Sequence, residues 1–205
     1  MFNKPVPITV VSGLPRSGTS MMMKMLETGG LPLIIDNLRI SDEDNPAGYY
    51  EFEPVKKLGK GDSGWLADAQ GKAVKVIAAL LVHLPAAYTY QIIFMHREMS
   101  EILASQRKML LNRGVDPNKI DDDEIARLFE SHLIKVDSWI GHQPNMRKID
   151  IHYNQLLKDP GQKAEEINRF LGNVLDVEKM LKVIDPGLYR QRSHLISAAS
   201  TSDVA

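Results

Sequence analysis

The stretch VVSGLPRSGTS, residues 10–20, constrains the fold more than any other part of the chain. An apolar, β-branched run ends at Gly13, and a short loop then closes on Gly18, Thr19 and Ser20 before a helical pattern begins. A strand that feeds a glycine turn and then a helix brings several backbone N–H groups to one point, where the helix N-terminus adds partial positive charge. This order of elements predicts a binding site for phosphate or sulfate.

Apolar, β-branched runs typical of buried parallel strands occur four times, at residues 8–13, 73–80, 90–97 and 148–153. The second run is equally compatible with a clipped strand followed by a short helix. Helical patterns occupy residues 18–28, 99–113, 121–133, 159–172 and 176–184. Strands that alternate with helices indicate βαβ units. We therefore expect an α/β fold with three layers, α/β/α, around a mainly parallel central sheet of about four or five strands.

The length of 205 residues suits one well-buried domain and is too short for two. We expect a single domain over residues 1–195 and a disordered tail over residues 196–205, where small polar side chains predominate. Twenty-five basic residues stand against 26 acidic ones, so the net charge does not favour nucleic acid or an anionic membrane as a partner. The sequence does not predict the oligomeric state.

The chain has no cysteine, which excludes disulfides, thiolate catalysis and cysteine-based metal sites. Neither a signal peptide nor an apolar run long enough for a membrane span is found, so we expect a soluble cytoplasmic protein. Three consecutive aspartates, residues 121–123, could form a metal site. Carboxylates that open a helix more often complement its N-terminal dipole, and we expect no metal.

The residue after the second glycine of the loop helps to identify the ligand. Nucleoside triphosphatases carry a lysine there, which reaches the β- and γ-phosphates. This chain has Thr19 in that place, and its cation, Arg16, stands inside the loop instead. No apolar run ends in a clear aspartate for Mg²⁺. The loop therefore argues against hydrolysis of ATP or GTP.

The loop GLPRSGTS resembles the 5′-phosphosulfate loop of the sulfotransferases that use 3′-phosphoadenosine 5′-phosphosulfate (PAPS). Its arginine form is similar to that of tyrosylprotein sulfotransferases and many bacterial relatives. The resemblance implies that Arg16 is catalytic and stabilises the departing 3′,5′-bisphosphate. It also implies that the 5′-phosphosulfate is held by the loop residues Gly13, Pro15, Arg16, Ser17, Gly18, Thr19 and Ser20.

A second part of the nucleotide site follows the third apolar run. Arg97 stands at the expected C-terminal edge of that strand, where open α/β sheets bind ligands, and Ser105 is eight residues later on the next helix. A guanidinium is a forked, always charged phosphate clamp, and a serine adds a short donor. An arginine and a serine at this spacing hold the 3′-phosphate in the PAPS-dependent family. The resemblance implies the same role here, which separates PAPS from ATP.

The segment 151–172 resembles the strand, Asp-Pro turn and Phe-Leu-Gly helix of the same family. The Arg-Lys-Gly motif near the C-terminus of cytosolic members is missing, and Arg190 and Arg192 are its possible substitutes. His83 copies part of a histidine motif of those members, but it stands only 14 residues before Arg97. We expect His83 to pack near a helix end and not to act as a base.

Transfer of a sulfuryl group depends on positioning and charge stabilisation, and a hydroxyl acceptor also requires a base. Tyrosylprotein enzymes place a glutamate after the loop helix, and this chain carries several carboxylates there. Alternation of polar and apolar residues over 50–53 predicts an extended piece whose two glutamates point the same way, into a cleft or into water. We expect Glu51 to be the base, with Glu53 and Asp36 as further candidates. Lys75 is expected either to face the sulfuryl group or to lie at the surface.

We therefore expect a sulfotransferase that uses PAPS and acts on an unidentified hydroxyl or amine. Two alternatives remain open. One is a small nucleotide kinase-like enzyme, which would bind Mg·ATP tightly, and the other is a non-catalytic nucleotide-binding or adaptor protein on the same fold. The acceptor is equally open between a small phenol, a carbohydrate and a peptide tyrosine.

Overall fold

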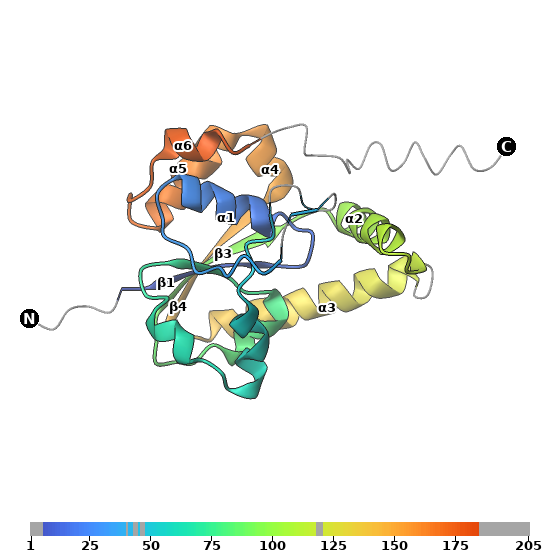
Figure 1. Cartoon of the computed structure of the whole chain (residues 1–205), viewed down its shortest axis with the longest axis horizontal. Coiled ribbons are helices and arrows are strands. Elements are labelled where there is room, and N and C mark those ends of the chain that lie inside the picture. The colour runs from blue at the N-terminus through green and yellow to red at the C-terminus, as the bar shows by residue number, and fades with distance from the viewer. Residues whose placement is uncertain (1–5, 40, 43–44, 46–47, 118–120, 185–205) are drawn as a thin grey trace, which may run out of the picture.

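The computed structural model of the chain describes residues 6–39, 41–42, 45, 48–117 and 121–184. Four strands form one parallel sheet in the order β2-β1-β3-β4, and helices cover both of its faces (Figure 1). This arrangement confirms the expected α/β fold and its parallel central sheet. Arg190, Arg192 and the expected tail lie outside the described residues. Within the described ranges, no helix combines the length and the apolar character that crossing a membrane requires.

The strands are β1 (Ile8–Gly13), β2 (Ala73–Lys75), β3 (Tyr90–His96) and β4 (Met146–His152). Three of them coincide closely with expected strands, whereas the interpretation of residues 73–80 as one strand is wrong. After Lys75 the chain turns into a short 3₁₀-helix, η3 (Ala78–His83). β2 pairs with three residues of β1, and on its other side Ala73 alone bridges to Leu33, so the ladder around this strand is short.

The α-helices are α1 (Thr19–Thr28), α2 (Met99–Asn112), α3 (Asp122–Gly141), α4 (Tyr153–Lys158), α5 (Pro160–Phe170) and α6 (Val177–Leu181), and two further 3₁₀-helices are η1 (Glu53–Lys60) and η2 (Gly64–Ala67). Helix α4 was not expected from the sequence. It is a short helix that follows β4 directly and ends at Asp159, whose side chain caps α5 by accepting a hydrogen bond from the N–H of Gln162 (3.2 Å).

The two central strands are buried on both faces. Alternate side chains of β1 and β3 point to opposite sides of the sheet. Val10 and Ile92 belong to one core, with α3, η1 and η3, whereas Val11 and Ile93 belong to the other, with α1, α5 and α6. Burial on both faces explains why these strands are continuously apolar in the sequence.

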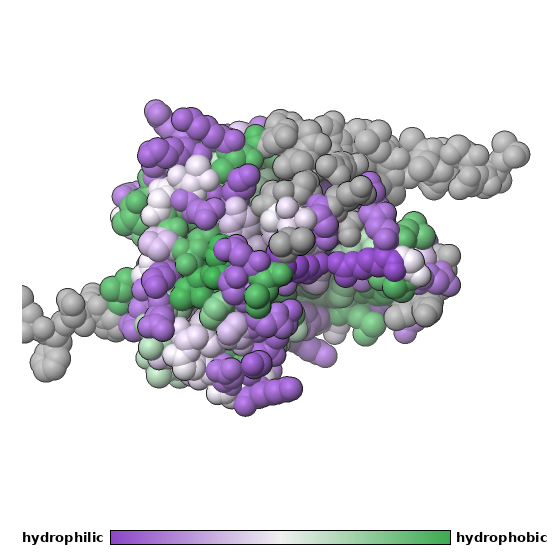
Figure 2. All heavy atoms as spheres, in the orientation of Figure 1, coloured by the Kyte–Doolittle hydropathy of each residue, from purple (hydrophilic) through white to green (hydrophobic). Residues whose placement is uncertain are grey.

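Helices α2 and α3 project beyond the edge of the sheet (Figure 1). Apolar side chains therefore stay in contact with solvent on these helices, as the green surface near their outer ends shows (Figure 2). Leu111, Leu128 and Ile134 are all more than half exposed. Asp122, the first residue of α3, pairs with Arg107 of α2 at 2.8 Å. The acidic triplet lies at the N-terminus of α3, where carboxylates complement the helix dipole.

The parallel topology determines where a ligand can bind. Gly13 of β1 lies in register with Met95 of β3, and Val11 lies in register with Lys75 of β2. The C-terminal ends of these three strands therefore meet at one edge of the sheet. The glycine loop after β1, the end of β2 and Arg97 after β3 converge there.

We predict that Leu26→Ala lowers the free energy of unfolding by about 2 to 5 kcal/mol, because Leu26 is fully buried in the core between α1 and the sheet. Urea denaturation monitored by circular dichroism measures this loss. Leu128→Ala is the matched control, since Leu128 of α3 is 60% exposed, and it should change the free energy of unfolding by less than about 0.5 kcal/mol. Equal losses in the two variants would contradict this assignment of the core.

Candidate functional site

The glycine loop between β1 and α1 is closely packed against its neighbours. A Cβ at Gly13 would lie 2.5 Å from the carbonyl oxygen of Met95, and a Cβ at Gly18 would lie 2.4 Å from the ring of Tyr153. Both glycines also have positive φ angles, 147° and 99°. The Ser17 side chain is buried and donates a hydrogen bond to the carbonyl oxygen of Leu14 (2.7 Å). Its hydroxyl therefore shapes the turn and does not line the cavity described below.

Arg16 has a left-handed backbone conformation, with a φ of 70°. Such a conformation costs a residue other than glycine about 1 to 3 kcal/mol unless its surroundings hold it. Two contacts do so. Arg97 Nη1 donates to the carbonyl oxygen of Arg16 (3.1 Å), and Arg16 Nε donates to Ser105 Oγ (2.8 Å). The structure thus brings together the three residues that the sequence assigned to the two phosphates.

The guanidinium of Arg97 is held from the protein side. Its Nε donates to Glu101 Oε2 at 2.9 Å, and the other carboxylate oxygen of Glu101 accepts from Asn154 Nδ2 at 3.1 Å. Glu101 is fully buried, and the Arg97 guanidinium lies 4.7 Å from the centre of the Tyr153 ring. Sequence reasoning missed these supporting residues. The signal for Glu101 was its place four residues after Arg97, in the first turn of the helix that follows β3.

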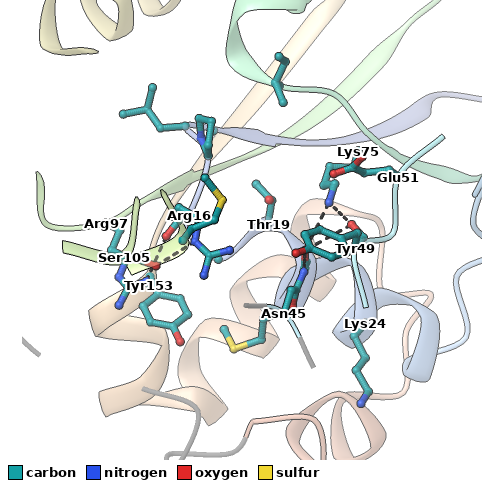
Figure 3. Close-up of a pocket in the computed structure, with 18 of the residues that line it drawn as sticks. Arg16, Thr19, Lys24, Asn45, Tyr49, Glu51, Lys75, Arg97, Ser105 and Tyr153 are labelled. Atoms are coloured by element: carbon teal, nitrogen blue, oxygen red, sulfur yellow. Dashed lines mark hydrogen bonds between the residues drawn. The ribbon is translucent and has the colours of Figure 1, made fainter. Parts of the chain in front are cut away.

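Asn45, Tyr49 and Lys75 lie on the other side of Thr19 from Arg16 (Figure 3), and Ser20 contacts all three of them. Its hydroxyl donates to the carbonyl oxygen of Tyr49 (3.3 Å) and accepts from Asn45 Nδ2 (2.9 Å) and Lys75 Nζ (3.3 Å). The ammonium group of Lys75 also donates to the carbonyl oxygen of Tyr49. These contacts attach the segment between α1 and η1 to the loop helix. We call the described part of this segment, within residues 31–52, the strap.

The three carboxylates considered as bases, Asp36, Glu51 and Glu53, have different surroundings in the structure. Asp36 accepts hydrogen bonds from the backbone N–H groups of Leu38 (3.0 Å) and Glu53 (2.5 Å), so it shapes the strap. The expected extended piece over residues 50–53 is wrong, because Tyr50 has a φ of 53° and Glu53 begins η1. The side chain of Glu53 pairs with a neighbouring lysine in η1, whereas Glu51 faces the cavity.

Arg39 and Tyr49 form a layered contact within the strap. The guanidinium carbon of Arg39 lies 3.3 Å from the centre of the Tyr49 ring, and Arg39 Nη1 donates to Glu51 Oε1 at 2.9 Å. The hydroxyl of Tyr49 lies 2.7 and 2.8 Å from the two carboxylate oxygens of Asp42. Burial and the hydrogen bond to Asp42 raise the pKa of Tyr49. The sequence alone did not reveal that Arg39 belongs to the site.

All these elements surround a cavity of about 440 Å³. Among the predicted site residues, Gly13, Pro15, Arg16, Gly18, Thr19, Ser20, Glu51, Arg97 and Ser105 line it. His83 does not, and it ends η3 beside Gly59 of η1, as expected. Among the residues that the structure describes, the lining contains one carboxylate, Glu51, and seven cationic side chains, Arg16, Lys24, Arg39, Lys75, Arg97, Lys108 and Arg113. Such a cavity is suited to a ligand with several negative charges.

Burial lowers the pKa of Lys75 to about 8; nearby Glu51 partly offsets this effect, and Arg39 adds to it. The folded protein therefore binds fewer protons at Lys75 than the unfolded chain does between about pH 8 and the ordinary lysine pKa of 10.5. Stability rises with pH wherever the unfolded state binds more protons.

We predict that the free energy of unfolding of the wild-type protein rises relative to that of Lys75→Met between pH 8 and 10, by up to roughly 3 kcal/mol. Urea denaturation at a series of pH values measures the difference. Lys60→Met is the control, since Lys60 is exposed at the end of η1 and should track the wild type. Parallel curves for wild type and Lys75→Met would contradict the assigned burial of the Lys75 ammonium group.

Comparisons with known proteins bear on the fold and on the family of the chain. The chain resembles the sulfotransferase domain from the Synechococcus PCC 7002 olefin synthase, with 16% identity, a TM-score of 0.51, and coverage of 93% of this chain and 84% of that one. It also resembles the sulfotransferase domain from the curacin biosynthetic pathway, with 14% identity, a TM-score of 0.52, and coverage of 95% and 83%. These two likenesses concern the fold. A comparison with curated protein sequences found no significant match.

A family model described as "Sulfotransferase family" matches residues 37–176, more than half of the chain. The match begins within the strap and extends through β4 and α5, so it includes Arg97, Ser105 and Glu51. The glycine loop precedes the matched range, and the structure joins that loop to Arg97 and Ser105. The chain therefore belongs to the sulfotransferase family.

Proposed function

We propose that the cavity binds PAPS and that the protein transfers the sulfuryl group of PAPS to a hydroxyl or amine acceptor. The observation that carries this proposal is the meeting of Arg16, Arg97 and Ser105 at one end of a cavity with seven cationic side chains. The 3′-phosphate of PAPS alone contributes about 1.5 to 2 negative charges. A ligand of this charge would offset the repulsion among the cations of the lining.

Each part of PAPS has a suitable group of residues in the cavity. The backbone N–H groups of the glycine loop, with Thr19 and Ser20, suit the 5′-phosphosulfate, because they lie at the N-terminus of α1. Arg97 and Ser105 suit the 3′-phosphate. Gly18 packs so closely on the Tyr153 ring that only glycine fits at this position of the loop. Met21, Tyr153 and Val183 add apolar lining suited to an adenine ring.

The surroundings of Ser20 argue against the kinase-like alternative. In nucleoside triphosphatases the hydroxyl at the start of the loop helix binds Mg²⁺. Here the Ser20 hydroxyl lies 3.3 Å from the ammonium group of Lys75, and a cation at that distance repels a second cation. Glu51, the one carboxylate among the described residues of the lining, pairs with Arg39. These contacts favour a metal-free transfer.

The residues around the cavity suggest how the transfer proceeds. PAPS supplies an activated sulfuryl group, whose bond to the phosphate oxygen breaks while a new sulfur–oxygen bond to the acceptor forms. Arg16 and Lys75 lie where they can stabilise negative charge on the departing bisphosphate. Glu51, at the strap end of the cavity, accepts the proton of the acceptor hydroxyl. Arg39 keeps one carboxylate oxygen of Glu51 oriented.

We predict that 3′,5′-ADP raises the melting temperature of the protein by several degrees. A ligand present at a hundred times its Kd adds about 2.7 kcal/mol to the free energy of unfolding. Differential scanning fluorimetry with 3′,5′-ADP, 5′-AMP and Mg·ATP measures the effect. Arg97→Ala should abolish the advantage of 3′,5′-ADP over 5′-AMP, because Arg97 is assigned to the 3′-phosphate.

Arg107→Ala provides the matched control. Arg107 is another arginine of α2, but it pairs with Asp122 of α3 and does not line the cavity. It should keep the wild-type preference for 3′,5′-ADP. Stabilisation by Mg·ATP alone would instead support a kinase-like enzyme, and an absence of stabilisation by any of the three nucleotides would contradict the proposed nucleotide site.

We predict that Glu51→Gln reduces kcat about 100-fold or more while the Kd for 3′,5′-ADP changes less than twofold, because the variant loses a base and keeps the nucleotide contacts. Transfer of ³⁵S from PAPS to a panel of phenols, sugars and tyrosine peptides measures turnover. Glu53→Gln is the control, since Glu53 lies two residues away, in η1, outside the cavity lining. Turnover by Glu51→Gln at the wild-type rate would show that Glu51 is not the base.

A further inference from the structure

The cavity has two chemically different ends. Figure 3 shows one group of side chains on one side of Thr19, namely Arg16, Arg97, Ser105 and Tyr153, and another on the opposite side, namely Asn45, Tyr49, Glu51 and Lys75. The first group provides the phosphate-binding contacts described above. The second group belongs to the strap and to the end of β2, and it is therefore the place for the acceptor. This inference rests on the proposed function.

Arg39 is held at the acceptor end in a defined orientation. Its guanidinium stacks on the Tyr49 ring at 3.3 Å, and Tyr49 is itself buried and anchored by Asp42 through its hydroxyl. Arg39 Nη1 donates a hydrogen bond to Glu51 Oε1, and the guanidinium also interacts with the Tyr49 hydroxyl. A guanidinium has five N–H donors, and once oriented it can bind a carboxylate, phosphate or sulfate with two parallel hydrogen bonds.

The positive charge of the cavity also favours an acidic ligand at this end. Among the described residues, seven cations and one carboxylate line it, a surplus larger than the roughly four negative charges that PAPS brings. That carboxylate, Glu51, is already paired with Arg39 and lies 3.9 Å from the exposed Lys56. A neutral acceptor would leave this surplus in place, whereas an acidic one would reduce it.

Apolar surface is scarce at this end of the cavity. Among the described residues of the lining, β2 and the turn after it contribute Val76 and Ile77, while Arg39 covers a face of the Tyr49 ring. A large apolar acceptor would therefore bury little hydrophobic area here, and its binding would gain little free energy.

We propose that the acceptor is an acidic alcohol or phenol, with a carboxylate, phosphate or sulfate group near the hydroxyl that receives the sulfuryl group. Arg39 binds the acidic group and is the specificity-determining residue. The same guanidinium orients Glu51, so the acidic group and the hydroxyl of one molecule are presented to adjacent side chains. Sulfation then adds a negative charge to a molecule that is already acidic.

The proposal can be tested without knowing the natural acceptor. The protein is saturated with 3′,5′-ADP, which occupies the nucleotide phosphate sites, and the Arg Nε–H resonances are followed by NMR. Glucuronate and methyl phosphate are then titrated as acidic probes, and methyl glucoside as a neutral probe of similar size to glucuronate. We expect the Arg39 resonance to shift saturably with the acidic probes and to stay unchanged with methyl glucoside.

Two variants make the assignment specific. Arg39→Gln should weaken binding of the acidic probes about tenfold or more, as followed through the backbone N–H of Glu51, because a charged bidentate contact is lost. Lys56→Gln removes an exposed cation 3.9 Å from Glu51, outside the cavity lining, and should leave probe binding unchanged. Arg39→Lys keeps the charge without the fork and should give an intermediate loss.

The outcomes separate this inference from the proposed function. If 3′,5′-ADP does not bind, the nucleotide site is wrong and the inference falls with it. If 3′,5′-ADP binds but the acidic probes leave the Arg39 resonance unmoved, only the acidic acceptor is overturned. If Lys56→Gln and Arg39→Gln weakened binding of the acidic probes equally, general attraction by positive charge would explain the binding. That result would also overturn the assignment to Arg39.

Discussion

The guanidinium of Arg97 is the contact on which the rest of the site depends. It donates to the carbonyl oxygen of Arg16 in the glycine loop and to the buried carboxylate of Glu101 in α2, and it lies over the ring of Tyr153 in α4. One side chain thus joins the segments that follow β1, β3 and β4. Because these contacts are made within the protein, Arg97 is oriented before any ligand arrives, which reduces the entropy cost of binding.

The same site concentrates positive charge in a partly buried cavity, which is unfavourable in the absence of an anion. The lowered pKa of Lys75, caused mainly by burial, is one sign of this cost. The left-handed backbone of Arg16 is a second unfavourable feature of the site, and the contacts with Arg97 and Ser105 hold it in place. Binding sites often retain such unfavourable features because ligand binding relieves them. A polyanionic nucleotide and an acidic acceptor would each offset part of the repulsion.

How much of the site the sequence could predict depended on the range of the interactions. The glycine loop, Arg97 and Ser105 were identifiable because each stands at a regular place relative to a strand or helix. The alternation over residues 50–53 was misleading, since the preceding residue, Tyr49, is held by contacts with Ser20 and Lys75 and Tyr50 has a left-handed backbone. The length of β2 was overestimated for a similar reason, because an apolar run does not show how many residues of its partner strand are available.

The sequence by itself therefore determined the parallel α/β architecture, and it identified the glycine loop, Arg97 and Ser105 as residues of one site. Continuous apolar runs, glycines and helix starts are local features, and their physical consequences extend over only a few residues. Only the tertiary structure decided that Glu51 lines the cavity while Glu53 does not, and that Arg39 stacks on Tyr49 beside Glu51. Those placements depend on contacts between distant segments, whose partners a local pattern does not specify.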